Sequence, residues 1–512
     1  MPRPNRTSFR SAACLAVAAA LFLPGCLSMR PEAMTSEEVA RRNAATLALL
    51  AAEKEPLPAE LTLGFAYARA LQYNLDRRVK AMETAIAFGQ FDLAKFDTLP
   101  KLTAEAGYFN RDNESIVRSR DSVTGQPSLA HPSVSSDRNH MSSSVGPTWS
   151  LLDFGASYYT AKQAGDRALS AVERRRKSTH LLLAEVRSAF WRVAVAQRLE
   201  TELVETLRVA DAALVEGRRL EQERLRPPAE SLRLQKALLE NIRQLEALRQ
   251  DMQAARLELA HLLSAPTDAR FTVREPTFTL PPGLVDVPAA DLETAALAHN
   301  PDVAVALYDA RIAQLDARKA IVKLFPSVTF DYELHHDTDN YMINNSWNTA
   351  SARISFDLFR LATLGRDLDS IELTEQLAQR KQMAVLMAVV AQVHLARLEY
   401  QTALHAYGRA DDLAQVDGRL RDIAVRQGKE EAQSKLDVVS ARTSAIVSLG
   451  HRYQAIVQAQ AAIGRLQSTL GVDPVSETAL DLPTDQLAQR LEAYLAGWQD
   501  GSWLKNLNLQ PR

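Results

Sequence analysis

The stretch of sequence that decides the fold occurs twice, as NLDRRVKAMETAIAFGQFDLAKFDTLP at residues 74–100 and as NPDVAVALYDARIAQLDARKAIVKLFP at residues 300–326. At this offset of 226 residues (300 − 74), Asp76 aligns with Asp302. Farther along the chain the offset falls to 207 (393 − 186), and Val186 aligns with Val393. The first copy therefore carries a longer loop, between residues 108 and 145. A repeat this long indicates a duplicated domain rather than a solenoid of short units.

Each copy continues with the same order of structural signals. A helix is predicted over 61–98 and again over 290–324, and a proline ends each one because it cannot continue the helical hydrogen bonding. Apolar and polar residues then alternate in four predicted strands, at 101–110, 142–151, 327–335 and 349–358. This alternation is typical of a membrane barrel with a polar lumen, and equally of a half-buried sheet in a soluble domain.

Two very long helices follow the strands. Residues 155–223 and 361–427 contain no proline, and a helix of that length extends roughly 100 Å. Apolar residues in the first helix follow a 4-3 spacing, as in Leu182, Val186 and Ala189, which is typical of coiled-coil packing. Turns are predicted at Pro227-Pro228 and at Gly428. The helical hairpins are therefore predicted over 155–264 and 361–470.

The N-terminus has the features of an export signal. Residues 1–25 combine a basic start with an apolar core at 12–23, which is too short for a membrane-spanning helix. The sequence Leu23-Pro24-Gly25-Cys26 resembles a bacterial lipobox, which predicts lipidation of Cys26. An ordinary signal peptide with a chance cysteine is the alternative. Leu27, the next residue, is compatible with sorting to the outer membrane.

No uninterrupted apolar run after Cys26 approaches 18 residues, so we expect no membrane-spanning helix. An exported chain that crosses a membrane without helices must use closed β-strands. The barrel interpretation of the strands is therefore favoured over the soluble sheet. Four strands cannot enclose a channel, so we expect subunits to share the barrel. The predicted segments are a signal peptide (1–25), a lipid-anchored segment (26–60), a first repeat (61–289, with a linker at 265–289), a second repeat (290–474) and a C-terminal segment (475–512).

Composition and motifs argue against catalysis and nucleic-acid binding. The formal net charge is −2, which gives no excess of positive charge for nucleic acid. No serine-hydrolase, phosphate-loop, zinc-protease or paired-cysteine motif is present in the sequence. A metal site at His335-His336 with Asp337 is a minor alternative to a polar loop. The basic run 174–177 is interpreted as a solvated helix face, with contact to a lipopolysaccharide surface as its alternative.

Several short motifs, in a fixed order and largely duplicated, resemble the TolC-like outer-membrane efflux proteins. They are Ala70-Leu71-x-x-Asn74, Leu99-Pro100, Leu152-Asp153-Phe154-Gly155, Ala296-Leu297-x-x-Asn300-Pro301, Phe325-Pro326, Leu436-Asp437-Val438-Val439 and Leu470-Gly471. The resemblance covers almost the whole mature chain. It implies a mainly α-helical fold with a transmembrane β part. Duplicated units of strands and long helical hairpins would form a homotrimer with a twelve-stranded β-barrel and a periplasmic α-helical coiled-coil barrel.

The resemblance also implies a function. Such a protein is a non-enzymatic efflux channel that passes solutes such as drugs or metals from an inner-membrane pump and a periplasmic adaptor to the outside. The implied pump is of the resistance–nodulation–division type, and the implied location is the bacterial outer membrane, with a lipid anchor at Cys26. A duct for type I protein secretion and a periplasm-spanning coiled-coil lipoprotein without a pore are the alternatives. No cofactor is implied beyond the lipid.

Two sets of site residues follow from the resemblance. The hairpin tips are expected to dock the adaptor through Arg224, Leu225, Arg226, Gln427, Gly428, Lys429 and Glu430. Asp437 is expected to form a ring at the pore constriction of the trimer. The family pattern can place a second acid one turn later, where this chain has Ser440. In the first copy Glu230 occupies the position equivalent to Asp437.

Overall fold

The structure is a computed structural model, and it describes residues 32–52, 56–118, 120–127, 132–223, 227–266, 269–274, 286–430 and 435–500. The chain divides into two units, Met1–Pro56 and Leu57–Arg512. The first unit contains helix α2 (Ser36–Ala52). The predicted signal peptide and Cys26 lie outside the described residues. All other described elements belong to the second unit.

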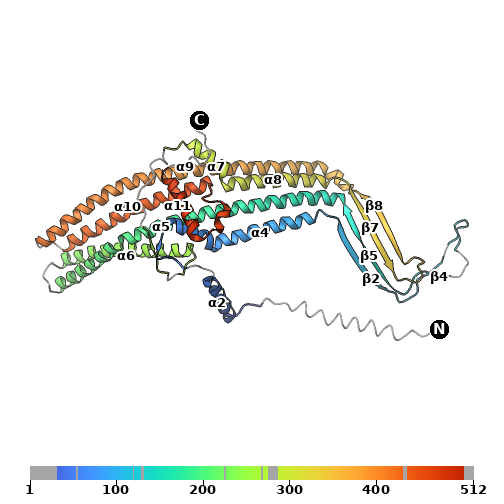
Figure 1. The fold of residues 1–512 in the computed structure, drawn as a ribbon, viewed down its shortest axis with the longest axis horizontal. Helices are drawn as coiled ribbons and strands as arrows, with labels where there is room; N and C mark the ends of the chain where they lie inside the picture. Colours follow the sequence, from blue (N-terminus) through green and yellow to red (C-terminus); the bar gives the residue numbers. More distant parts are fainter. Residues whose placement is uncertain are drawn as a thin grey trace. The chain divides into compact units, whose positions relative to one another are not determined.

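The second unit contains the two repeats as the same series of elements (Figure 1). The first repeat comprises α3 (Leu63–Tyr73), α4 (Leu75–Phe96), β2 (Lys101–Asn110), β5 (Asn139–Ser150), α5 (Leu151–Gln222) and α6 (Pro228–Leu262). The second comprises α7 (Ala289–His299), α8 (Pro301–Val322), β7 (Ser327–Asp337), β8 (Ser346–Ser355), α9 (Phe359–Glu430) and α10 (Lys435–Leu470). Smaller elements are β1 (Glu60–Leu61), β3 (Ile116–Val117), β4 (Ser133–Val134), β6 (Thr272–Val273), η2 (Glu477–Asp481) and α11 (Thr484–Asp500). Strand β2 occupies its predicted range, whereas β8 lies three residues before its predicted range.

The single helix predicted in front of each strand pair is wrong, because an asparagine divides it. Asn74 and Asn300 have extended backbones and cap the helix that follows. The Asn74 Oδ1 accepts a hydrogen bond from the Arg77 amide at 3.1 Å, and the Asn300 Oδ1 accepts one from the Asp302 amide at 2.7 Å. An N-cap side chain of this kind replaces the missing hydrogen-bond partner of the first turn. The duplicated asparagine therefore starts α4 and α8.

The same two asparagines also bind the end of the returning helix in their own repeat. The Asn74 Nδ2 donates to the Leu262 carbonyl at 3.2 Å, and the Asn300 Nδ2 donates to the Thr469 carbonyl at 2.7 Å. Leu262 and Thr469 are equivalent positions at the offset of 207 (469 − 262). Each asparagine thus joins the first and last helices of one repeat, which explains why the Ala-Leu-x-x-Asn motif occurs twice.

Substitution of Asn300 tests this double role. Asn300→Ala is expected to destabilise the protein by about 2–4 kcal/mol, because it removes a cap and leaves the Thr469 carbonyl without its donor. Asn300→Ser retains a capping oxygen, so it is expected to cost only about half as much. The measurement is the midpoint of thermal unfolding in detergent, with the exposed Asn344→Ala as the control. Equal midpoints for Asn300→Ala and the parent would contradict the assignment.

The returning helices end in the same backbone turn. Gly471 has a φ of 69° and its equivalent Ser264 has a φ of 50°. A side chain at Gly471 would also meet the His299 carbonyl, since an added Cβ would lie 2.4 Å from that oxygen. The glycine in the Leu470-Gly471 motif is therefore required by both the backbone conformation and the close approach.

The four long strands form one antiparallel sheet in the order β2-β5-β7-β8. The hairpins β2–β5 and β7–β8 each belong to one repeat, whereas β5–β7 joins the two repeats. Gly146 lies at this junction, and an added Cβ there would be 2.0 Å from the Tyr332 carbonyl oxygen. Strands β2 and β8 are the edges of the sheet, and neither has a second strand partner among the described residues.

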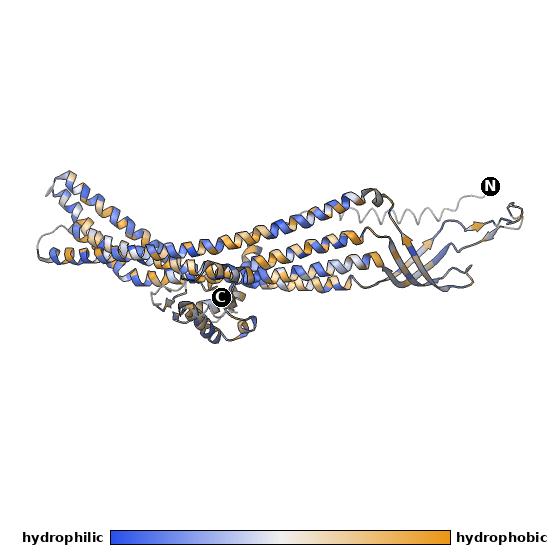
Figure 2. Cartoon of the chain, turned by 90° about the horizontal axis from the view of Figure 1, so that it is seen from above, coloured by the Kyte–Doolittle hydropathy of each residue, from blue (hydrophilic) through white to orange (hydrophobic). Residues whose placement is uncertain are grey.

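Long helices form most of the rest of the second unit, with the sheet at one end and the hairpin tips at the other (Figure 1). Helix α5 has 72 residues, which corresponds to roughly 110 Å. It packs against α4 and α8 near the sheet and against α6 and α10 near the tips. Figure 2 shows hydrophobic and hydrophilic residues intermixed along these helices. The predicted 4-3 positions are buried in α5, namely Leu182, Val186, Ala189, Val193, Ala196, Leu203, Leu207, Ala210 and Leu214.

Candidate functional site

The sheet has an apolar face that the described chain leaves exposed. Leu102 is 74% exposed and Ile354 is 73% exposed, although both are large aliphatic side chains in regular strands. Phe330, Tyr332 and Leu334 of β7 share this face with them and are also exposed. The opposite face carries Thr329, Asp331 and Glu333. A sheet with this division of side chains suits a boundary between a lipid phase and a polar lumen.

The layer of helices near the sheet has an apolar stripe along each edge. In Figure 1, α4 and α9 flank α5 and α8 on opposite sides. The α4 stripe comprises Leu75, Val79, Met82, Ile86, Leu93 and Phe96, which are three, four or seven residues apart and all exposed. The α9 stripe comprises Leu373, Leu377, Met387 and Leu398, which are four, ten and eleven residues apart and all exposed. Both spacings keep the residues of a stripe on one face of their helix. An exposed apolar helix face of this kind suits packing against another helix.

The first hairpin tip is only partly described. Helix α5 ends at Gln222, and α6 begins at Pro228 with Pro227 as its N-cap residue, as the proline pair predicted. Arg224, Leu225 and Arg226, the residues expected to contact the adaptor, lie outside the described residues.

The second tip differs from the prediction, because α9 continues through Gly428 and ends at Glu430. A glycine inside a helix costs only about 1 kcal/mol, which the packing of so long a helix outweighs. Gln427 is exposed, whereas the side chains of Gly428, Lys429 and Glu430 lie outside the described part of the chain. Helix α10 begins at Lys435.

Asp437 lies in the first turn of α10 and its side chain is exposed. Two residues later, Val439 is buried in an apolar cluster with Leu207 and Leu238. The helix therefore presents Asp437 away from the core that α10 shares with α5 and α6. An acidic residue also stabilises the first turn through the helix dipole. Its equivalent, Glu230, occupies the first turn of α6.

The basic run is a solvated face only in part, because Arg174 and Lys177 are exposed but three of the four residues form ion pairs. Arg175 forms an ion pair with Glu477, and Lys177 forms one with Asp302 at 2.8 Å. Arg176 binds Asp473 at 3.0 Å. Burial alone would raise the pKa of Asp473, but its hydrogen bond to His180 and the charge of Arg176 outweigh this effect and lower it. The run therefore joins α5 to α8 and to the segment after α10.

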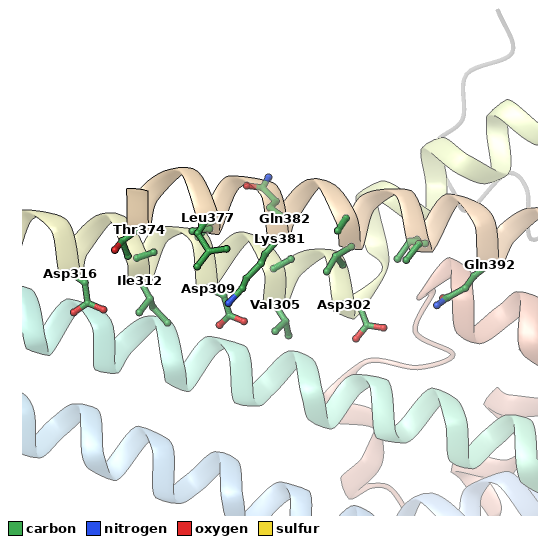
Figure 3. A pocket seen from close by; sticks show the side chains of 18 residues that line it. Asp302, Val305, Asp309, Ile312, Asp316, Thr374, Leu377, Lys381, Gln382 and Gln392 are labelled. Atoms are coloured by element: carbon green, nitrogen blue, oxygen red, sulfur yellow. The ribbon is translucent and has the colours of Figure 1, made fainter. Parts of the chain in front are cut away.

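A groove of about 850 Å³ runs between α8 and α9 (Figure 3). Figure 3 shows Asp302, Asp309 and Asp316 in one row along α8, seven residues apart. The Lys381 side chain extends towards this row from α9. Across the described residues, no group of three or more potential ligands forms a metal site.

The histidines at the end of β7 point in different directions. His335 stacks on Trp347 with the ring centres 5.1 Å apart, and its Nε2 lies 3.3 Å from the Glu333 carboxylate. The His336 ring instead lies 2.9 Å from the Ser346 hydroxyl. Adjacent strand residues face opposite sides of a sheet, so the two imidazoles do not converge on one ion.

One helix among the described residues has a window long and apolar enough to cross a membrane, within residues 362–427 of α9. The same helix buries Val389, Val393 and Tyr400 against its neighbours. It is also roughly 110 Å long, more than three times a bilayer span. We therefore interpret the apolar window as the exposed edge of the helical layer.

No protein-family model matches the sequence, and no curated protein matches it. Solved structures do match. The chain is similar to the Campylobacter jejuni CmeC outer membrane channel, with a TM-score of 0.64, 13% identity, and 86% of this chain and 93% of that chain covered. It is similar to the open state of the Neisseria gonorrhoeae MtrE outer membrane channel, with a TM-score of 0.59, 18% identity and coverages of 80% and 88%. It is also similar to the outer membrane protein VceC from Vibrio cholerae, with a TM-score of 0.60, 16% identity and coverages of 80% and 96%.

These likenesses establish the fold. The chain has the architecture of bacterial outer-membrane channels, mainly helical, with long hairpins and a short-stranded sheet. More specifically, it is the fold of the TolC-like efflux channels, as the duplicated motifs predicted.

Proposed function

We propose that the protein is the outer-membrane channel of a tripartite efflux system. The observation that carries this proposal is the position of the sheet at one end of helical hairpins roughly 110 Å long. The sheet has one apolar and one polar face, and the helices extend far beyond the thickness of a bilayer. The structural neighbours with this arrangement are outer-membrane channels.

A single chain cannot form the channel, so we infer a closed ring of copies. The sheet ends in two free edges, and the helical layer ends in the α4 and α9 stripes. Different surfaces that meet head to tail close into a ring with rotational symmetry. The resemblance to TolC-like proteins assigns three copies, a homotrimer with a shared barrel.

The remaining parts of the proposal concern location and partners. Cys26 carries the lipid anchor in the outer membrane, and the helices extend into the periplasm. The hairpin tips are farthest from the sheet, so the periplasmic adaptor docks there, through Arg224 to Arg226 and Gln427 to Glu430. The inner-membrane pump, of the resistance–nodulation–division type, supplies the energy, and the channel carries drugs or metal ions without chemical change.

Planar-bilayer recording of the purified full-length oligomer tests the channel. We expect discrete conductance steps from the parent protein. Ile86→Asp places a charge in the α4 stripe and is expected to abolish both the oligomer and the conductance, because a charge buried between helices is costly. Ala85→Asp adds the same charge one residue earlier, at an exposed position outside the stripe, and is the matched control. A stable oligomer without conductance would overturn the proposal.

A further inference from the structure

The internal duplication relates the strand pairings of the two repeats residue by residue. In the first repeat, Lys101 of β2 pairs with Thr148 of β5. Addition of the two offsets, 226 and 207, gives Ser327 and Ser355, and these residues pair in β7–β8. The hairpins of the two repeats therefore share one register, and the offsets relate equivalent strand positions without a slip.

The pairing between the repeats has no equivalent within the chain. Strand β5 pairs with β7, and in this pairing Val145 lies opposite Leu334. The duplicate of β5 is β8, and the duplicate of β7 is β2. These are the two edge strands of the sheet, which lie apart in one chain. Only a second copy brings an equivalent β8–β2 pair together.

We propose that β8 of one copy pairs antiparallel with β2 of the next in the register of the β5–β7 junction. Val145 corresponds to Ala352 (145 + 207), and Leu334 corresponds to Tyr108 (334 − 226). Ala352 therefore lies opposite Tyr108 of the neighbouring copy. The proposal rests on the ring of the proposed function and specifies how its copies join.

The side chains at this seam are compatible with the register. Ala352 and Tyr108 both belong to the apolar face, so that face continues from one copy to the next. On the polar face Arg353 lies opposite Gly107 of the neighbour, and Glu105 of the neighbour is its diagonal partner. The glycine leaves room for the arginine side chain, and diagonal neighbours are within reach of long side chains. We infer an Arg353–Glu105 ion pair across every seam.

The internal junction shows a similar combination of residues. Gly146 of β5 lies at the position opposite Glu333 of β7, and an added Cβ there would be 2.7 Å from the Glu333 Cα. A glycine thus faces a long charged residue at the junction within the chain and, in the proposed register, at the seam between copies.

Disulfide cross-linking tests the register. We expect the double variant Tyr108→Cys with Ala352→Cys to form covalent trimers on a non-reducing gel after mild oxidation. Within one chain these positions are separated across the sheet alone by three strand spacings, roughly 14 Å, which already exceeds the limit of about 7 Å between the Cα atoms of a disulfide. Any disulfide between them must therefore join two copies.

Matched controls test whether cross-linking requires the proposed register or occurs wherever the two edge strands meet. Ala352→Cys combined with Ala106→Cys, or with Asn110→Cys, shifts the pairing by two residues on the same face, and we expect several-fold less cross-linked product. Ala352→Cys alone reports any reaction with Cys26. The register would be overturned if Ala106→Cys or Asn110→Cys gave more cross-linked product than Tyr108→Cys. It would also be overturned if no cysteine pair gave cross-linked product in an oligomer that conducts. A chain that neither assembles nor conducts would instead contradict the proposed function.

A charge exchange provides an independent readout. Arg353→Glu places a second carboxylate near Glu105 of the next copy, so we expect less trimer after purification. The double variant Arg353→Glu with Glu105→Arg is expected to restore it. A double variant that is no better than Arg353→Glu alone would contradict the proposed ion pair.

Discussion

Gly146→Ala is expected to abolish assembly of the oligomer. The added Cβ would lie 2.0 Å from the Tyr332 carbonyl oxygen and 2.7 Å from the Glu333 Cα. Both atoms belong to the backbone of β7, so no side-chain rotation can relieve the overlap. Strands β5 and β7 must separate, and the pairs on either side, such as Val145 with Leu334, lose their hydrogen bonds. Overpacking of this kind costs about 3 kcal/mol or more.

The matched control for this substitution is Gly418→Ala in α9, away from the sheet. No atom lies within 4 Å of an added Cβ there, and alanine is the better helix former. The measurement is the yield of the oligomer by size-exclusion chromatography in detergent. We expect almost none for Gly146→Ala and near-parental yield for Gly418→Ala. Parental yield for both variants would show that β5 and β7 are not so closely packed.

The sequence predicted the architecture well because its signals are local and occur twice. Alternating residues such as Val328, Phe330 and Tyr332 mark a strand without knowledge of its partner. Likewise, the 4-3 spacing around Val186 marks a buried helix face. The duplication then confirmed that both copies carry the same series of elements, and the solved structures share that fold.

The predictions that were wrong in whole or in part concern positions where contacts between distant parts of the chain determine the structure. The break at Asn74 combines a local cap on the Arg77 amide with a hydrogen bond to the Leu262 carbonyl, which lies 188 residues away in sequence. The partners of the basic run include Asp473 and Glu477, about 300 residues away. Gly428 was predicted to end a helix, but its helix continues because packing outweighs the intrinsic cost of glycine. The long-range contacts leave no local signature, although the Ala-Leu-x-x-Asn motif that contains both asparagines occurs in each copy.

The tip residues expected to dock the adaptor and Asp437 at the expected constriction act against neighbouring molecules. Their roles are therefore proposals. Asp437 nevertheless has a geometry suited to a ring. It lies next to the described end of the hairpin, in the first turn of α10, and is exposed while Val439 beside it is buried. Threefold symmetry would bring three Asp437 carboxylates to one level of the channel. Ser440, one turn nearer the sheet, adds no second ring of charge.

Asp437→Ala is therefore expected to relieve block of the channel by multivalent cations. A ring of carboxylates binds such cations strongly, because each cation interacts with several like charges at one narrow level. Hexamminecobalt added on the periplasmic side should block the parent channel in a planar bilayer. The substitution should raise the half-blocking concentration at least tenfold, which corresponds to about 1.4 kcal/mol. Glu230→Ala, the equivalent change in the first repeat, controls for the general loss of negative charge near the tips. If Asp437→Ala is blocked at the parental concentration, Asp437 does not line the constriction. If Glu230→Ala relieves the block equally, the effect reflects overall charge at the tips rather than a ring formed by Asp437.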